Sequence, residues 1–143
     1  MLATTSLGAI WTSTSPDFGV ESVKERFGQV QPKILFCCNG YSFNGKTFKM
    51  DEKNNQIVQS ISSIQNTCHI DYLQIGQESP FGNEQFSDWE SILASYIPRG
   101  LRYQRIGFND PLFVLYSSGT TGKPKCIVPV SYTHLTLPTS GEV

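Results

Sequence analysis

The chain has 143 residues and a formal net charge of −1, with 11 basic and 12 acidic side chains. Its length fits a single domain, and the near-neutral charge excludes the basic surfaces typical of nucleic-acid-binding and anionic-membrane-binding proteins. No stretch approaches the ~20 apolar residues of a membrane span, and the N-terminus lacks the basic and apolar segments of a secretory signal.

The first third of the sequence predicts a strand, a turn, a helix and a second strand. Residues 20–30 place Val20, Val23, Phe27 and Val30 on one face of a helix. The other predicted elements are the end of a helix in 1–10, an extended segment at 11–15, a turn at 15–19 and a buried strand at 33–38. This order indicates a βαβ unit, with two parallel strands in one sheet and a right-handed crossover.

The remaining elements extend this pattern to an α/β fold. The dipeptide Asn44-Gly45 predicts a β-hairpin over residues 41–48, and Ser87 with Glu90 forms a capping-box pattern that predicts a short helix. The other predicted elements are a helix over 51–64 with Ile57, Ile61 and Ile64 on one face, a strand at 69–75, loops at 76–86 and 98–110, and a buried strand at 111–116. We expect a mainly parallel sheet flanked by helices.

The four cysteines, at positions 37, 38, 68 and 126, include no Cys-x-x-Cys pair. We interpret them as reduced thiols of an intracellular protein. The alternative is a zinc site that uses Cys68 and His69, but the spacing fits no common zinc pattern.

A loop rich in glycine and hydroxyl groups follows the predicted strand at 111–116 and carries the clearest chemical signal. Its two glycines allow the backbone to approach a ligand closely, its hydroxyls are neutral donors, its lysines add positive charge, and it contains no carboxylate. These features suit a polyphosphate. The candidate phosphate-binding residues are Ser117, Ser118, Gly119, Thr120, Thr121, Gly122, Lys123 and Lys125.

The loop differs from the P-loop pattern GxxxxGK[ST]. Only two residues separate its glycines, and Pro124 stands where a Ser or Thr would hold magnesium. The alternative is an ordinary surface loop. We favour a ligand-binding role because the string Gly-Thr-Thr-Gly-Lys-Pro-Lys directly follows a predicted buried strand.

The same string resembles the phosphate-binding signature of the adenylate-forming enzymes, which include acyl-CoA synthetases, luciferases and peptide-synthetase adenylation domains. Residues 8–19, 26–36 and 110–119 resemble the acetoacetyl-CoA synthetases in particular. The resemblance covers residues 1–128 and is looser over about 39–100. It implies part of the large N-terminal, AMP-binding domain of such an enzyme.

The resemblance also implies an activity. A carboxylate attacks the α-phosphate of ATP to give an acyl-adenylate and pyrophosphate, and coenzyme A then displaces AMP. ATP, Mg²⁺ and coenzyme A are the implied cofactors and substrates, acetoacetate is the implied acid, and the implied compartment is the cytoplasm. On this basis Ser118, Thr120 and Thr121 donate hydroxyls, the glycines expose N–H groups, and Lys125 faces the phosphates. Lys123 stands at a variable position of the pattern.

The chain also departs from the family. It lacks the Tyr-Gly-x-Thr-Glu motif, the ribose-binding Asp and the catalytic Lys that the family pattern places further on, so we expect no catalytic residue and no ligase activity in these residues alone. We interpret residues 1–128 as a partial AMP-binding domain and residues 129–143, which include His134, as a non-native or unstructured tail; a divergent native tail is the alternative. Two other functions stay open: a short-chain acetyl- or propionyl-CoA synthetase, and a non-catalytic nucleotide-binding remnant.

The remaining polar residues have ordinary structural interpretations. We expect Asp17 to cap a turn and His69 to lie on a strand surface. Three arginines near Tyr103 form a small basic cluster, for which a solvated surface is favoured over a contact with a coenzyme A phosphate; they are Arg99, Arg102 and Arg105.

Overall fold

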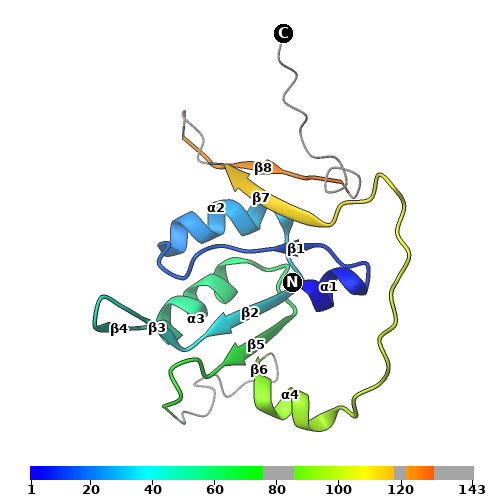
Figure 1. The fold of residues 1–143 in the computed structure, drawn as a ribbon. Helices are drawn as coiled ribbons and strands as arrows, with labels where there is room; N and C mark the ends of the chain where they lie inside the picture. Colours follow the sequence, from blue (N-terminus) through cyan, green and yellow to red (C-terminus); the bar gives the residue numbers. More distant parts are fainter. Residues whose placement is uncertain (76–85, 118–121, 131–143) are drawn as a thin grey trace. The chain divides into compact units, whose positions relative to one another are not determined.

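The structure is a computed structural model that describes residues 1–75, 86–117 and 122–130 (Figure 1). The chain forms two compact units. The first joins Met1–Ser13 to Arg99–Val143, and the second is the continuous segment Thr14–Pro98.

The first unit contains a three-stranded sheet in the order β1-β7-β8. Strand β1 pairs in parallel with β7, and β7 pairs in antiparallel fashion with β8. The elements are α1 (Leu2–Ser6), β1 (Trp11–Thr12), β7 (Phe113–Ser117) and β8 (Lys125–Ile127). Residues 98–110 contain neither helix nor strand, as predicted, and the amide of Gln104 donates to the carbonyl of Ser6 at 2.8 Å.

The second unit contains a parallel sheet in the order β2-β5-β6 and a separate β3–β4 hairpin. Its elements are α2 (Val20–Val30), β2 (Ile34–Cys38), β3 (Gly40–Phe43), β4 (Lys46–Lys49), α3 (Asp51–Ser60), β5 (Asn66–Ile70), β6 (Phe86–Asp88) and α4 (Trp89–Ser95). The predicted α/β class with parallel strands and helices is confirmed.

Helices α2 and α3 pack together, and each contributes buried side chains to the second unit's core. The predicted helix over residues 20–30 is confirmed with the same bounds, and Val23 and Phe27 on its apolar face are buried. Helix α3 ends at Ser60, four residues earlier than predicted. Its expected apolar face is nevertheless buried, since Ile57, Ile61 and Ile64 are all enclosed; the turn after the helix holds Ile64 in place.

The predicted hairpin is confirmed. Asn44 and Gly45 have φ angles of 48° and 72°, the left-handed pair that a two-residue type I′ turn requires. Tyr41 and Phe48 face each other across the two strands, and their rings stack with centroids 5.0 Å apart. The stacked pair stabilises the register that the turn sets.

The expected βαβ unit at residues 11–38 is wrong. Strand β1 pairs with β7, whereas β2 pairs with β5, so the two strands belong to different sheets. The parallel connection in the structure is β2–α3–β5, with the hairpin inserted before the helix. Periodicity predicts a helix or strand from neighbouring residues, but it does not predict which strands pair. The partner of the two-residue strand β1 lies about a hundred residues further along the chain.

Two further predicted boundaries are wrong. Strand β5 covers Asn66–Ile70 rather than 69–75. Helix α4 is capped by Asp88, whose carboxylate accepts the Ser91 amide at 3.0 Å, while Ser87 belongs to strand β6. Both misplacements have one cause. Strand β5 pairs with β2 on one side and with β6 on the other, and this pairing draws residues into strands that a local pattern assigns to loop or cap. Of the predicted loop at 76–86, residues 76–85 lie outside the described residues.

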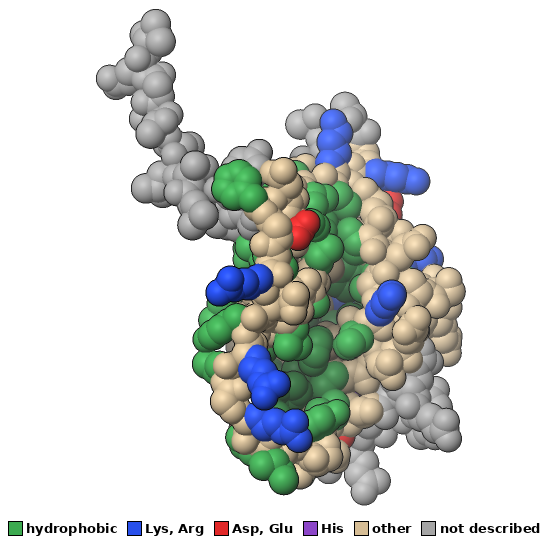
Figure 2. Space-filling view, turned by 90° about the vertical axis from the view of Figure 1, so that its right-hand side faces the viewer, with side chains coloured by type: hydrophobic (Ala, Val, Ile, Leu, Met, Phe, Trp, Pro, Cys, Tyr) green, Lys and Arg blue, Asp and Glu red, His purple; other side chains and the backbone are tan. Residues whose placement is uncertain are grey.

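The strands predicted as buried are covered on one face only. In β2, Leu35 is buried while Ile34 is 57% exposed; in β7, Val114 is buried while Leu115 is 54% exposed. Hydrophobic side chains therefore reach the surface, as Figure 2 shows. Within the described residues, no helix has the length and apolar character needed to cross a membrane.

Candidate functional site

The candidate loop starts and ends in one pair of strands. Strand β7 ends at Ser117 and β8 begins at Lys125, and these two residues are partners in the antiparallel ladder. The ladder therefore closes the loop at its base. Ser118, Gly119, Thr120 and Thr121 lie outside the described residues, so the geometry concerns the ends of the loop.

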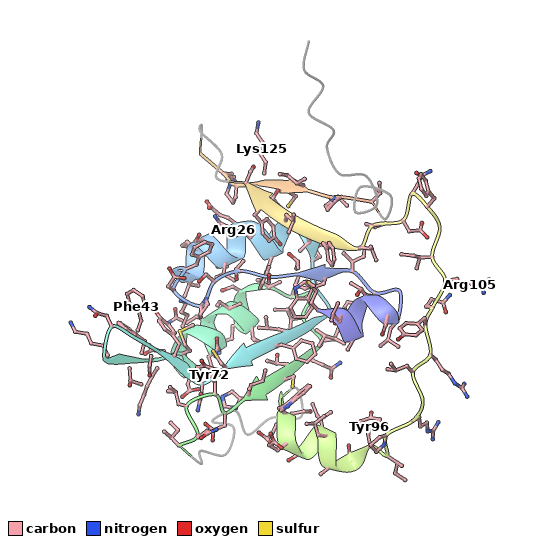
Figure 3. All side chains as sticks on the ribbon, viewed as in Figure 1. Arg26, Phe43, Tyr72, Tyr96, Arg105 and Lys125 are labelled. Atoms are coloured by element: carbon pink, nitrogen blue, oxygen red, sulfur yellow. The ribbon has the colours of Figure 1, made fainter. Side chains whose placement is uncertain are left out.

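The side chains of Ser117 and Lys125 lie on the same face of the sheet, because partners in an antiparallel ladder share a face. The Ser117 hydroxyl lies 3.5 Å from the Lys125 carbonyl oxygen, a long contact across the base. Lys125 is exposed and its side chain extends away from β8 in Figure 3. One hydroxyl and one ammonium group are thus presented together where the loop begins and ends.

The returning half of the loop shows why a glycine is needed there. Gly122 has a φ angle of +120°, a conformation that L side chains rarely adopt, and open space surrounds the position of a Cβ atom. Lys123 beside it is exposed, whereas Pro124 is buried. The backbone at Gly122 is therefore open to a ligand, and its neighbour Pro124 anchors the segment.

The charge at the described ends of the loop is entirely positive. Lys123 and Lys125 are exposed, and the residues from Ser117 to Lys125 include no carboxylate. A polyanion would meet two cations and no repelling group. These residues fit a phosphate chain.

A second contact secures the strand from which the loop leaves. The Thr12 hydroxyl lies 3.0 Å from the Val114 carbonyl oxygen and 2.9 Å from the phenol oxygen of Tyr116. Tyr116 is the residue directly before Ser117. Sequence patterns do not indicate this contact, because Thr12 and Tyr116 are 104 positions apart.

His69 is not the strand-surface group that we expected. It is 0% exposed, and its Nε2 lies 3.5 Å from Oδ1 of Asp51, the first residue of α3. Residues of α3 cover the face of β5 that carries His69. The alternating pattern of the strand alone does not predict this burial.

The thiols of Cys37 and Cys68 are poorly suited to nucleophilic chemistry. Burial raises the pKa of Cys37 to about 12 and also raises the pKa of Cys68, and a neutral thiol is a weak nucleophile and metal ligand. In the part of the chain that the structure describes, no group of three His, Cys, Asp or Glu side chains could hold a metal ion. The basic cluster lies in a segment without helix or strand, as expected, and Arg99, Arg102 and Arg105 are exposed.

Comparison with known proteins agrees with the loop's chemistry. The profile of the family described as "AMP-binding enzyme" matches residues 1–137. "Acetoacetyl-CoA synthetase" from Rattus norvegicus is 42% identical over 135 residues, and "Acetoacetyl-coenzyme A synthetase" from Rhizobium meliloti (strain 1021) is 41% identical over 128 residues. Each alignment covers 90% of this chain and 20% or 19% of the relative.

The fold gives the same result. The solved structure "Acetoacetyl-CoA Synthetase from Streptomyces lividans" superposes with a TM-score of 0.81 at 40% identity, covering 90% of this chain and 19% of that one. The chain therefore spans about a fifth of the length of the relatives it matches. With its loop, its fold and a family match over nearly all of its residues, the chain belongs to the family of AMP-binding enzymes.

Proposed function

We propose that this chain supplies the triphosphate-binding segment of an AMP-forming acid–CoA ligase that activates acetoacetate. The observation that carries the proposal is the pairing of Ser117 with Lys125 at the base of a loop whose described ends bear two exposed lysines and no carboxylate. The identity of about 40% to proteins named acetoacetyl-CoA synthetase supports the choice of acid.

In this proposal the loop holds the β- and γ-phosphates of ATP while an acid carboxylate attacks the α-phosphorus. Negative charge builds on the departing pyrophosphate, so fixed donors and cations near it lower the barrier. Lys125 supplies the main charge and Lys123 a weaker one. Backbone N–H groups at Gly119 and Gly122 donate to phosphate oxygens, and so do the hydroxyls at the start of the loop: Ser117, Ser118, Thr120 and Thr121.

The proposed reaction uses ATP and coenzyme A as co-substrates and Mg²⁺ as the metal ion. In this proposal the loop contributes to Mg²⁺ binding by holding the phosphates, whose oxygens are common ligands of this ion. The partners are small molecules, with neither nucleic acid nor membrane among them, and the proposed compartment is the cytoplasm.

The acyl group is the least constrained part of the proposal. "Malonamoyl-CoA synthetase vrtB" from Penicillium aethiopicum is 36% identical over 133 residues, so similar segments occur in proteins named for different acids. Acetoacetate is preferred because the relatives of higher identity carry that name. Faster ATP–pyrophosphate exchange with acetate or propionate, measured on the complete protein that contains this chain, would contradict the choice.

The proposed domain comprises residues 1–128, with residues 129–143 as a tail that takes no part in the site. Val130 forms an isolated antiparallel bridge with Pro111, while residues 131–143 lie outside the described residues. All the proposed phosphate-binding residues lie between Ser117 and Lys125, so deletion of residues 129–143 is expected to leave phosphate binding unchanged.

A chimera tests the proposed function. Residues 1–128 would replace the matching segment of the Streptomyces lividans enzyme, whose fold agrees over that region, and exchange of labelled pyrophosphate into ATP would be measured with acetoacetate. We expect activity in the chimera and a loss of at least about a hundredfold for Lys125→Ala, the scale for removing one donor from an oxyanion site. Gly119→Ala should also lose activity, because its methyl group would hinder the close approach of the backbone to the phosphates.

The matched control is Lys33→Ala, which removes an exposed lysine from the second unit. This variant is expected to keep the activity of the chimera. Unchanged exchange in both loop variants would overturn the proposal.

A further inference from the structure

We propose that Thr12 is a positioning residue for the phosphate loop and that it acts through the phenol of Tyr116. The inference rests on the proposed function of residues 117–125. It assigns a role to a residue more than a hundred positions away from that loop in the sequence.

The backbone places Thr12 beside β7. The amide of Trp11 donates to the Leu112 carbonyl at 3.0 Å, and Thr12 is then in register with Val114. From that position its hydroxyl lies 3.0 Å from the Val114 carbonyl oxygen and 2.9 Å from the Tyr116 phenol oxygen. One side chain on β1 thus contacts both the backbone and a side chain of β7.

The Thr12 hydroxyl can form hydrogen bonds with the Val114 carbonyl and the Tyr116 phenol at the same time. A threonine hydroxyl has one proton to donate and lone pairs to accept with, so it can donate to the Val114 carbonyl while it accepts from the Tyr116 phenol. Hydrogen bonds arranged in such a chain polarise one another. Serine could reproduce this arrangement, whereas valine has the same shape and cannot.

Tyr116 connects this contact to the loop. It precedes Ser117 in β7, and its ladder partner Cys126 follows Lys125 in β8. Its side chain lies on the half-buried face of the sheet, opposite the exposed face that carries Ser117 and Lys125. Fixing the ring of Tyr116 therefore fixes the end of β7, from which the loop leaves, beside the start of β8, to which the loop returns.

The test is an isothermal calorimetric titration of the 143-residue chain with inorganic tripolyphosphate, which measures the Kd of the complex. We expect Thr12→Val and Tyr116→Phe each to raise the Kd about fivefold, the worth of one ordinary hydrogen bond. The double variant should bind about as well as Thr12→Val alone, because that change has already broken the contact between Thr12 and the Tyr116 phenol. Thr12→Ser is expected to restore the original Kd.

The matched control is Thr5→Val, which removes a hydroxyl that donates to the Leu2 carbonyl at 3.1 Å in helix α1 of the same unit. It is expected to leave the Kd unchanged. Absence of tripolyphosphate binding by the unaltered chain would overturn the proposed function and this inference with it. Weakened binding in Lys125→Ala, with normal binding in Thr12→Val and Tyr116→Phe, would overturn the positioning role alone.

A kinetic measurement in the chimera covers the case in which a variant of the isolated chain fails to fold. Thr12→Val should lower kcat/KM for ATP about fivefold, leave KM for acetoacetate unchanged and be rescued by Thr12→Ser. A loss of active enzyme without any change in KM for ATP would mean a purely structural role, and would overturn the inference.

Discussion

The side-chain amide of Asn39 donates to the carboxylate of Asp71, and the two residues directly follow the neighbouring parallel strands β2 and β5. The amide oxygen of Asn39 also accepts the Leu73 amide at 3.1 Å. Its backbone amide donates to the Ile70 carbonyl at 3.1 Å, so one buried residue joins the ends of two strands.

Asn39→Ala is expected to lower the free energy of unfolding by about 2–4 kcal/mol. The side chain is 1% exposed, and its removal leaves the Asp71 carboxylate and the Leu73 amide without that partner. Urea unfolding monitored by circular dichroism measures the change. Gln65→Ala, at an exposed position of the same unit, should stay within about 0.5 kcal/mol of the unaltered chain. Equal stability of the two variants would show that the Asn39 network is dispensable.

Two glycines are expected to respond in opposite directions to alanine. A Cβ atom on Gly40 would overlap the Phe48 carbonyl oxygen and a methyl group of Leu73, whereas one on Gly28 would meet nothing within 4 Å. Gly40→Ala should destabilise the chain by about 1–3 kcal/mol through overpacking. Gly28→Ala, inside helix α2, should stabilise it by about 0.5–1 kcal/mol. Thermal melting of both variants decides the matter, and a Gly40→Ala chain that melts at the normal temperature would refute the expected clash.

The burial of Cys37 should appear as a loss of stability at alkaline pH. Burial raises its pKa from 9.0 to about 12, with smaller contributions from Cys38, Cys68 and Asp51. Between these values the unfolded chain binds fewer protons than the native chain at this site, so the free energy of unfolding falls as pH rises. The contribution is complete below pH 9 and disappears between pH 9 and about 12.

Urea unfolding of the unaltered chain and of Cys37→Ala at pH 7, 9 and 10.5 tests this. The unaltered chain should lose up to about 1 kcal/mol more per pH unit above pH 9 than the variant does. Other titrating groups are common to both chains and cancel in the difference. Parallel pH profiles for the two chains would contradict the assignment.

Asp88 and Ser87 distinguish the observed cap of α4 from the predicted one. Asp88→Ala removes the carboxylate that accepts the Ser91 amide and should cost about 1 kcal/mol. Ser87→Ala, one residue earlier in β6, should have an effect of less than about 0.5 kcal/mol. If Ser87→Ala proves the more damaging change in urea unfolding, the capping-box interpretation would be restored.

The isolated chain is expected to show no acetoacetate- and coenzyme A-dependent formation of AMP. The residues that the family pattern assigns to the acyl-adenylate, the ribose and the second half-reaction are not among these 143. A coupled AMP assay on the purified chain, with the chimera as positive control, provides the measurement. Turnover by the chain alone would mean that it holds a complete active site.

Local patterns predicted the elements whose signals lie within a few residues. Helix α2 is specified by its apolar spacing and by Pro32 after it, and the β3–β4 turn by the left-handed preference of Asn44 and Gly45. The candidate phosphate-binding loop was predicted in the same way, from a compact string of residue types. Its described ends fit the interpretation, while the roles of its individual residues stay predictions.

The failures concern interactions between distant residues. The strand partners of β1 and the burial of His69 depend on segments far away in the chain, and neither follows from the spacing of neighbours. Thr12 is the clearest case, because nothing around residues 11–13 indicates a hydrogen bond to Tyr116. Positioning residues of this kind become visible only when the strand pairing is known.

The first unit is built from two segments that are far apart in the sequence, and this has a consequence for folding during synthesis. The second unit is one continuous segment and can fold as soon as it leaves the ribosome, whereas Trp11 and Thr12 pair with Phe113 and Val114. At about 5–20 residues per second, β1 waits roughly 5–20 s for its partner strand to be synthesised. During that interval the apolar residues next to β1 are exposed to solvent. Slow translation between the two segments of this unit would therefore favour misfolding and binding by chaperones.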